Sequence, residues 1–316
     1  MQMTINFKEV KMKIYNAKYG TLEWYAFRKS GVGGSEVAAA LGLSKWKTPY
    51  QLWLEKTTDV EPLEDNWNLL RGRALEPALR QEYANVTGRE VSVIEGFVQH
   101  DKYDFMFYSP DGISPDGRLQ EFKTAAYGHG WGEAGSDEVP QEYALQVQYG
   151  LMLTKLKVSD CTVSIGAKKP ELFVINEDLE LQELIKNGVY DFWMKVRELS
   201  PPEPINEDDL RLIYAKKVNA NPIAIQESLI EVLEAVKLGK RELKEWEAFT
   251  DAASFKVKAF MGEFETLLDS DGNVLATWKK AKDSEKFNLA KFKDCHPKLY
   301  SEFLEPVEGS RRFLVK

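Results

Sequence analysis

A proline-rich segment divides this chain into two parts of different character. Ser200-Pro201-Pro202-Glu203-Pro204 cannot continue a helix or form a central strand, because proline lacks a backbone N–H and has a fixed φ angle. The residues before this segment combine helix and strand patterns, whereas those after it are mainly helical. We therefore predict a mixed α/β domain at residues 1–199, a linker at 200–206 and a helical C-terminal extension with a terminal β hairpin at 207–316.

The C-terminal extension contains a long series of mainly apolar residues. Between Leu229 and Leu267 these residues alternate spacings of three and four. This spacing predicts a long amphipathic helix or a helical hairpin, which either packs within the chain or forms an intermolecular coiled coil. The segment Asp269-Ser270-Asp271-Gly272-Asn273 predicts a hairpin turn before a strand at 274–278, and residues 311–316 are predicted to form a basic strand.

The first part of the chain shows the alternation of elements that is typical of an α/β fold. Thr48, Pro49 and Gln51 form a capping box at the start of one helix, and Pro77 should kink another. We expect helices near 36–41, from 49 onward, at 67–86 and at 141–153, and strands near 91–98, 105–108, 119–123, 158–165 and 172–175.

Composition limits the classes of protein that this chain can represent. Its net charge of −8 disfavours a nucleic-acid binder with a basic surface, but a local cationic groove can coexist with an acidic exterior. With three histidines and two cysteines, the chain offers neither a zinc motif nor a disulfide framework, which fits a reducing cytoplasm. No apolar run approaches the roughly 18 residues that span a bilayer, and we expect no signal peptide at Met1.

Two short segments carry the strongest chemical signal in the sequence. Side chains alternate along a strand, so Glu121 and Lys123 should project to one face of the sheet and Phe122 to the other. Asp111 follows an aromatic strand at a Pro-Asp-Gly turn. If these strands pair, two carboxylates and one ammonium converge, and such a set suits Mg²⁺, a cation that prefers oxygen ligands. Lys123 could then orient or deprotonate a water molecule, or offset phosphate charge.

The same residues also have an ordinary structural interpretation. Pro-Asp-Gly is a common turn, and Glu-x-Lys is a common solvated strand face. A second turn, Ser114-Pro115-Asp116-Gly117, offers Asp116 as a competing acid. We favour Asp111, because it directly follows the strand that we expect to pair with the Glu121 strand.

A glycine-rich segment offers a possible anion site. Gly31-Val32-Gly33-Gly34 leads into Ser35, a good helix N-cap, so free backbone N–H groups of this loop could face an anion, and Arg28 adds guanidinium donors. The alternative is a loop whose glycines serve only close packing. No lysine follows in the position that a nucleotide-binding P-loop requires.

Five short segments follow one another along the chain: Arg28-Lys29-Ser30-Gly31-Val32-Gly33-Gly34-Ser35-Glu36, Arg71-Gly72-Arg73-Ala74-Leu75-Glu76, Ser109-Pro110-Asp111-Gly112, Glu121-Phe122-Lys123 and Gln146-Val147-Gln148-Tyr149. In this order they resemble the lambda-exonuclease-like and YqaJ-type viral recombinase nucleases of the PD-(D/E)XK superfamily. The resemblance covers roughly residues 20–195, and the extension beyond it resembles the tail of some YqaJ-type proteins. This resemblance implies a restriction-endonuclease-like α/β core, with a mixed central sheet flanked by helices.

The resemblance also implies roles for individual residues. Asp111, Glu121, the helical Glu76 and the backbone carbonyl of Phe122 would bind Mg²⁺, for which Mn²⁺ may substitute. Lys123 would be the catalytic lysine. The remaining implied site residues are Gln146 in the active site, and Arg28, Gly33, Gly34, Ser35 and Tyr149 in binding the 5′-phosphate or DNA.

The implied activity is exonuclease digestion of double-stranded DNA ends, with 5′→3′ polarity. Such a phage- or prophage-encoded enzyme would act in the bacterial cytoplasm and leave 3′ single strands for a single-strand annealing protein during DNA recombination. A trimeric ring is implied by the resemblance only. Two alternatives remain open: a non-processive or endonucleolytic nuclease of the same superfamily, and a DNA-binding recombination mediator without activity.

Overall fold

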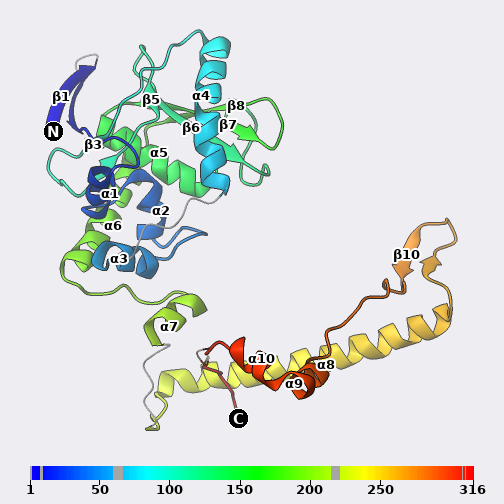
Figure 1. Ribbon diagram of the computed structural model, residues 1–316. Coiled ribbons are helices and arrows are strands. Elements are labelled where there is room, and N and C mark those ends of the chain that lie inside the picture. Colours follow the sequence, from blue (N-terminus) through cyan, green and yellow to red (C-terminus); the bar gives the residue numbers. More distant parts are fainter. Residues whose placement is uncertain (1, 8–9, 60–66, 215–220, 308, 310) are drawn as a thin grey trace. The chain divides into compact units, whose positions relative to one another are not determined.

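The computed structural model contains two compact units, Met1–Ile213 and Tyr214–Lys316. Figure 1 shows the chain coloured along its sequence. The structure describes residues 2–7, 10–59, 67–214, 221–307, 309 and 311–316, with side chains from Met12 onward. The two units are described separately below.

Two four-stranded sheets form the framework of the first unit. The first sheet is antiparallel throughout, whereas the second is mixed, because β6 and β7 run parallel and its other pairs run antiparallel. The first sheet has the order β1 (Gln2–Phe7), β2 (Val10–Tyr15), β3 (Phe97–Gln99), β4 (Phe107–Tyr108). The second has the order β5 (Gly112–Ile113), β6 (Leu119–Ala125), β7 (Val158–Ile165), β8 (Glu171–Asn176).

The mixed sheet confirms the predicted α/β core, but the predicted pairing of one strand is wrong. The segment at 105–108 was expected to pair with the Glu121 strand, and instead β4 pairs with β3 of the first sheet. The chain then turns at Ser109-Pro110-Asp111, and β5 pairs with β6. Proline has no N–H to donate to a ladder, so Pro110 ends one strand and the chain crosses to the other sheet.

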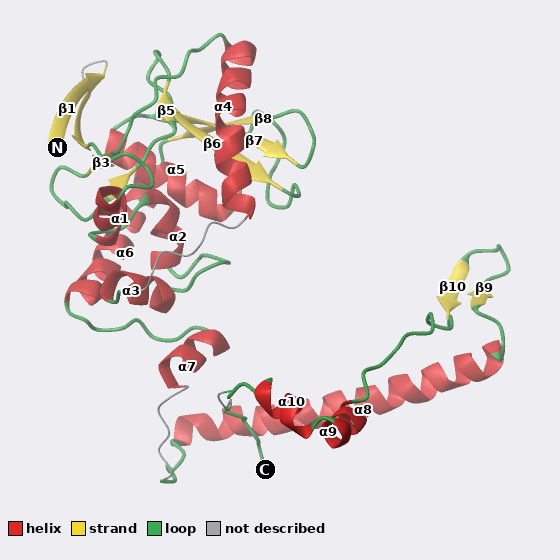
Figure 2. Ribbon diagram, in the orientation of Figure 1, coloured by secondary structure: helices red, strands yellow, loops and turns green. Residues whose placement is uncertain are grey.

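Two helices cover opposite faces of the mixed sheet (Figure 2). Helix α5 (Gln141–Thr154) connects the parallel strands β6 and β7, which cannot be joined by a tight hairpin. Helix α4 (Trp67–Thr87) packs Leu79 and Tyr83 against Phe122 on the other face. As predicted, Phe122 lies on one face of the sheet, toward α4, and Glu121 and Lys123 lie on the other face, toward α5. Pro77 lies inside α4, as predicted.

The remaining helices of the first unit are short, apart from α6. The capping box that was predicted at Thr48 is present, since Thr48 Oγ1 accepts a hydrogen bond from Gln51 N (3.1 Å) and Gln51 Oε1 accepts one from Thr48 N (3.0 Å). These helices are α1 (Leu22–Lys29), the 3₁₀ turn η1 (Gly34–Glu36), α2 (Val37–Ala40), α3 (Pro49–Thr57), α6 (Leu179–Arg197) and α7 (Glu207–Tyr214).

The boundary between the two units lies later than the predicted domain end at residue 199. Asp209 of α7 is fully buried and accepts a hydrogen bond from Thr48 Oγ1 (2.7 Å). This contact attaches the segment after the prolines to the first unit. The prolines therefore lie within that unit, between α6 and α7.

The second unit is mainly helical. The predicted apolar series forms one 32-residue helix, α8 (Ile230–Met261), rather than a helical hairpin. The turn at Asp269–Asn273 joins an antiparallel hairpin, as predicted. Residues 311–316 form no strand, which contradicts the predicted terminal strand, and in the described part of this unit the hairpin precedes α9. The other elements are η2 (Glu227–Leu229), β9 (Thr266–Leu268), β10 (Val274–Thr277), α9 (Leu289–Cys295) and α10 (Pro297–Glu302).

Across the described residues of both units, no helix combines the length and the apolar character that crossing a membrane would require.

Two helical glycines should respond to alanine in opposite directions. A Cβ at Gly150 in α5 would lie 2.7 Å from the Tyr108 ring and 2.9 Å from Leu119, whereas a Cβ at Gly239 in α8 meets nothing within 4 Å. Gly150→Ala should therefore destabilise its unit by about 1–3 kcal/mol through overpacking. Gly239→Ala should stabilise its helix by about 0.5–1 kcal/mol. Urea and thermal unfolding of both variants measure these changes, and changes of the same sign would contradict the packing.

Candidate active site

Glu121 and Lys123 lie on one face of β6, beneath α5. Lys123 Nζ donates to Glu121 Oε1 and to Gln146 Oε1 (3.2 Å), and Gln146 Nε2 donates to Glu121 Oε1 (2.6 Å). Glu121 is only 2% exposed. The structure thus brings together three of the predicted site residues: Glu121 and Lys123 from β6, and Gln146 from α5.

Asp111 joins this cluster from the turn between the two sheets. Its Oδ2 accepts a hydrogen bond from the backbone N–H of Phe122 (2.7 Å), which holds the carboxylate against β6. The competing acid, Asp116, forms an ion pair with Arg89 (3.0 Å) and accepts a hydrogen bond from Ser114 Oγ (2.5 Å). The geometry therefore favours Asp111 over Asp116 as a partner of Glu121 and Lys123.

Tyr108 is a member of this cluster that sequence reasoning missed. Its side chain is fully buried, and its hydroxyl donates to Glu121 Oε2. Burial, together with the charges of Glu121 and Asp111, raises the pKa of Tyr108 well above its usual value, so the hydroxyl keeps its proton and remains a donor. The aromatic residue directly before Ser109-Pro110-Asp111 was the available sequence signal.

The cluster has more negative than positive charge. Burial and the neighbouring Glu121 carboxylate raise the pKa of Asp111 well above its usual value, although Lys123 opposes this. Burial alone would lower the pKa of Lys123, but Glu121 and Asp111 outweigh it and raise this pKa. Lys123 is therefore a fixed cation between two carboxylates.

Glu76 lies near the cluster but does not join it. Its carboxylate pairs with Arg80 one turn along α4, and its negative charge contributes to the raised pKa of Asp111. Within the described ranges, no three His, Cys, Asp or Glu side chains lie close enough together to hold a metal ion. Phe122 contacts the cluster through its N–H group, and the predicted role of its carbonyl stays a prediction.

The donor chemistry of the cluster nevertheless fits a hard divalent cation. Asp111 and Glu121 offer carboxylate oxygens, which Mg²⁺ prefers. Burial and, after it, the charge of Glu121 raise the pKa of Asp111, and a cation beside these carboxylates would favour the ionised form of Asp111. Asp111 and Glu121 are therefore the residues that would hold such a metal.

The glycine-rich loop lies beside this cluster. A pocket of about 80 Å³ is lined by the loop, by α1 and by residues that also belong to the acid–lysine cluster. We call it the loop pocket; its lining residues are Trp24, Arg28, Gly33, Gly34, Ser35, Phe97, Phe107, Tyr108, Ser109 and Gln146. Four predicted binding residues, Arg28, Gly33, Gly34 and Ser35, are thus brought together next to Gln146.

Glu36 controls the charge of this loop, and sequence reasoning assigned it no role. It is 7% exposed and accepts hydrogen bonds from Arg28 (2.6 Å), Lys56 (2.8 Å) and Gly33 N (2.9 Å). Burial would raise the pKa of Glu36, but Lys56 and Arg28 lower it to about 2. One predicted free N–H group, that of Gly33, is therefore already used. A glutamate that follows a glycine turn by three residues was the available signal.

The ion pairs of Glu36 leave one positive charge in excess. Burial lowers the pKa of Lys56, even though Glu36 raises it, so the pair contributes less to stability than the shift of Glu36 alone suggests. Arg28 also lies over the ring of Trp24, 5.1 Å from its centroid. Its guanidinium is held in place at the edge of the loop pocket, with about a third of its side chain exposed.

Tyr149 is buried and is not among the residues that line the loop pocket, which does not support the predicted binding role. Its side chain is fully buried, and its hydroxyl donates to the carbonyl of Val32 (3.0 Å). Since Gln146 and Tyr149 are three residues apart on α5, one reaches the acid–lysine cluster while the other supports the loop from inside. Tyr149 therefore positions the loop and does not line the pocket.

These features define an α/β domain with an acid–lysine cluster on a mixed sheet, next to a cationic glycine loop. Residues 23–157 match the model of the YqaJ-like viral recombinase domain. The matched span contains every site residue that the sequence predicted. The chain is 28% identical over 318 residues to the uncharacterized protein YqaJ of Bacillus subtilis (strain 168). The alignment covers 98% of each protein.

Two solved structures are similar to part of this chain. The alkaline exonuclease LHK-Exo from Laribacter hongkongensis is 23% identical, with a TM-score of 0.47, and the match covers 63% of this chain and 100% of that one. A phage-related exonuclease from Haemophilus somnus 129PT is 14% identical, with a TM-score of 0.43, and covers 54% of this chain and 94% of that one.

Replacing Asp111 should not weaken the fold at neutral or alkaline pH. Because the folded-state pKa of Asp111 is raised, its stabilising protonated form is present below the unfolded-state pKa of about 3.9 and is lost as the pH rises through the folded-state value. Asp111→Asn keeps an oxygen for the Phe122 N–H and removes the charge. We expect its melting temperature at about pH 8, without divalent metal, to equal or exceed that of the wild type. A clear loss of stability there would contradict the electrostatics of the cluster.

Proposed function

We propose that this chain is a metal-dependent deoxyribonuclease that degrades duplex DNA from its 5′ ends. One observation carries the proposal: Gln146 hydrogen-bonds Glu121 and Lys123 and also lines the loop pocket beside Arg28. Tyr108 also hydrogen-bonds Glu121 and lines this pocket, so the loop that we propose binds phosphate and the proposed hydrolytic cluster share two residues.

The residues of the cluster have separate tasks in the proposed reaction. Asp111 and Glu121 would hold Mg²⁺ (or Mn²⁺), which supplies Lewis-acid stabilisation and a more acidic water molecule. Lys123 remains protonated, because Glu121 and Asp111 raise its pKa, so it offsets phosphate charge and does not remove a proton. Gln146 orients Glu121 and Lys123, and Tyr108 holds the second oxygen of Glu121 from below. Glu76 would join only by leaving Arg80.

The polarity and the partners are part of the same proposal. We expect the loop pocket to favour a terminal phosphate over an internal one, because the buried rings of Trp24, Phe97 and Phe107 are part of its lining. Digestion from 5′ ends leaves 3′ single strands, which a single-strand annealing protein would take up in the bacterial cytoplasm during recombination. A homo-oligomeric ring, a trimer by resemblance, would keep the enzyme on DNA, and the helical extension would serve DNA retention or partner binding.

Single substitutions in the cluster should abolish hydrolysis of linear duplex DNA. Asp111→Asn, Glu121→Gln and Lys123→Met should each lose about 100-fold or more in rate, since each removes a charge next to the scissile phosphate. Asp116→Asn is the matched control, because it occupies the same Ser-Pro-Asp-Gly sequence but pairs with Arg89. Digestion with Mg²⁺, against an EDTA control, gives the rates.

Two further readouts test metal binding by the cluster and the requirement for a DNA end. Mg²⁺ should raise the melting temperature of the wild type more than that of Asp111→Asn, whatever the activity. Covalently closed circular duplex should remain intact, and its cleavage would point to an endonuclease. Wild-type turnover in any of the three cluster variants would overturn the assignment of the site.

The loop pocket predicts a preference for 5′-phosphorylated ends. Duplex with 5′-phosphates should be degraded at least about 5-fold faster than duplex with 5′-hydroxyls, as expected for a charge-assisted contact of about 1 kcal/mol or more. Arg28→Gln should reduce this ratio. Lys29→Gln is the control, because Lys29 pairs with Asp59 and does not line the pocket. Equal rates on both ends in the wild type would refute the phosphate pocket but not the nuclease.

A further inference from the structure

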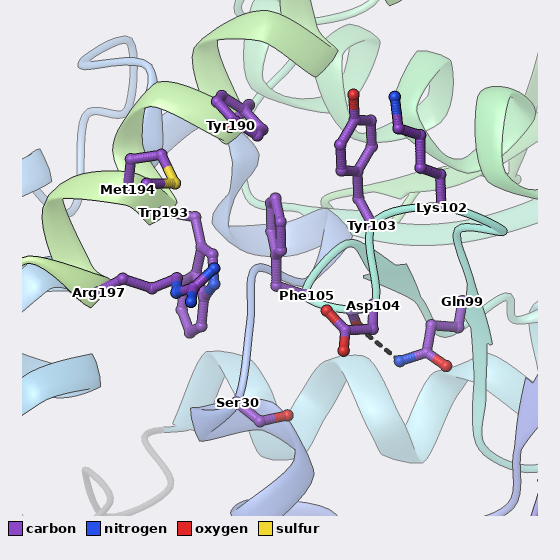
Figure 3. A pocket seen from close by; sticks show the side chains of 10 residues that line it. All are labelled: Ser30, Gln99, Lys102, Tyr103, Asp104, Phe105, Tyr190, Trp193, Met194 and Arg197. Carbon is purple, nitrogen blue, oxygen red and sulfur yellow. Dashed lines mark hydrogen bonds between the residues drawn. The ribbon is translucent and has the colours of Figure 1, made fainter.

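A second cavity lies in the first unit, apart from the acid–lysine cluster. Its volume is about 590 Å³, which is within the range of small-ligand sites. Figure 3 shows its lining side chains, which come from α6, from the segment between β3 and β4 and from the end of α1. We call it the Trp193 pocket; its lining residues are Ser30, Gln99, Lys102, Tyr103, Asp104, Phe105, Tyr190, Trp193, Met194 and Arg197.

Aromatic rings form the walls of the Trp193 pocket. Phe105 and Trp193 stack on each other, with centroids 5.6 Å apart and planes 14° apart, and both are buried. Tyr190 is 39% exposed, and its ring centroid lies 5.6 Å from that of Tyr103. The two buried rings thus support two tyrosines that remain accessible. Accessible aromatic rings on a rigid base provide a surface on which a planar ligand can stack.

Polar groups at the rim carry both signs of charge. Arg197 and Lys102 line the pocket, and within the part of the chain that the structure describes neither forms an ion pair. Asp104 and Gln99 add acceptors, and Gln99 Nε2 donates to the backbone carbonyl of Asp104 (2.6 Å). Cations for phosphate, acceptors for amino groups and rings for stacking are the groups that recognise a nucleotide.

The Trp193 pocket and the loop pocket lie at opposite ends of a short backbone pairing, in which Val32 pairs with the segment 105–107. Val32 N donates to the Phe105 carbonyl (2.7 Å), and Phe107 N donates to the Val32 carbonyl (3.2 Å). Ser30 and Phe105 line the Trp193 pocket, whereas Gly33 and Phe107 line the loop pocket. Phe105 and Phe107 are two residues apart, a separation of about 7 Å along extended chain, which corresponds to about two nucleotides of a stacked strand.

We propose that the Trp193 pocket is a second DNA site, which binds a nucleobase of a single strand close to the loop pocket. The base stacks on the exposed ring of Tyr190, and Arg197 and Lys102 contact the flanking phosphates. The site therefore holds a single strand of the DNA that the enzyme processes. This inference rests on the proposed function only in taking DNA as the ligand.

Equilibrium binding of a single strand to the full-length protein tests this proposal. Fluorescein-labelled oligothymidylate is titrated with protein in EDTA, and anisotropy is followed at several salt concentrations. Arg197→Gln should lower the slope of log affinity against log salt by about 0.7, the value for one phosphate contact on a single strand. Lys195→Gln is the matched control, because Lys195 lies in the same last turn of α6, is exposed and does not line the pocket.

A second variant separates base stacking from charge. Tyr190→Leu keeps an apolar side chain against Tyr103 and Phe105 but removes the ring, and it should weaken binding about 5-fold or more. An oligonucleotide whose sugars carry no bases should bind wild type and Tyr190→Leu equally. Melting temperatures and circular dichroism establish that the variants are folded.

The outcomes separate this proposal from the nuclease assignment, because EDTA prevents hydrolysis. Equal salt slopes for Arg197→Gln and Lys195→Gln, together with unchanged affinity of Tyr190→Leu, would overturn the second DNA site and leave the nuclease standing. Weaker binding in both pocket variants of a protein that cleaves no DNA would support the second site and overturn the proposed function.

Discussion

The architecture of the first unit depends on a buried carboxylate. Glu121 is 2% exposed on the central strand of the mixed sheet, where an unpaired charge would be unfavourable by several kcal/mol. Three donors from three different elements satisfy it: Lys123 from β6, Gln146 from α5 and Tyr108 from β4. Strand, crossover helix and first sheet therefore meet at one pair of oxygen atoms, and a change at any of these donors would leave that charge unsatisfied.

The arrangement of charges in the acid–lysine cluster destabilises the fold. Burial and the charge of Glu121 raise the pKa of Asp111, so the contribution of this acid to the free energy of unfolding falls as the pH rises above its unfolded-state pKa. Lys123 offsets only part of the negative charge. Shifted pKa values in neighbouring groups are typical of catalytic and metal-binding sites, and they also occur in structural ion pairs such as Glu36–Lys56. The strain is local, because the surrounding core of α4, α5 and the mixed sheet is well packed.

The loop segment around Val32 connects the parts of the molecule that we propose to contact DNA. Glu36 holds Arg28 and Gly33 on one side, and Tyr149 supports Val32 from within the core. The backbone of Val32 also joins Phe105 and Phe107. One rigid segment therefore positions the loop pocket, the cluster next to it and the Trp193 pocket. Glu36 also explains how a chain with a net negative charge can have a locally cationic surface. Its one buried carboxylate pairs with two cations, Arg28 and Lys56, which leaves one positive charge in excess.

Local patterns in the sequence determined the elements and the faces of their side chains. The alternation of Glu121, Phe122 and Lys123 predicted which side chains share a face, and the capping residues at Thr48 and the apolar series of α8 predicted helices, because these patterns depend on neighbours along the chain. Tertiary structure alone decided the partners: that β5, not the 105–108 segment, pairs with β6, that Tyr108 holds Glu121, that Glu36 binds Arg28 and Lys56, and that Tyr149 is buried. These contacts join residues far apart in sequence, and their energies depend on burial and on charges that no local pattern contains.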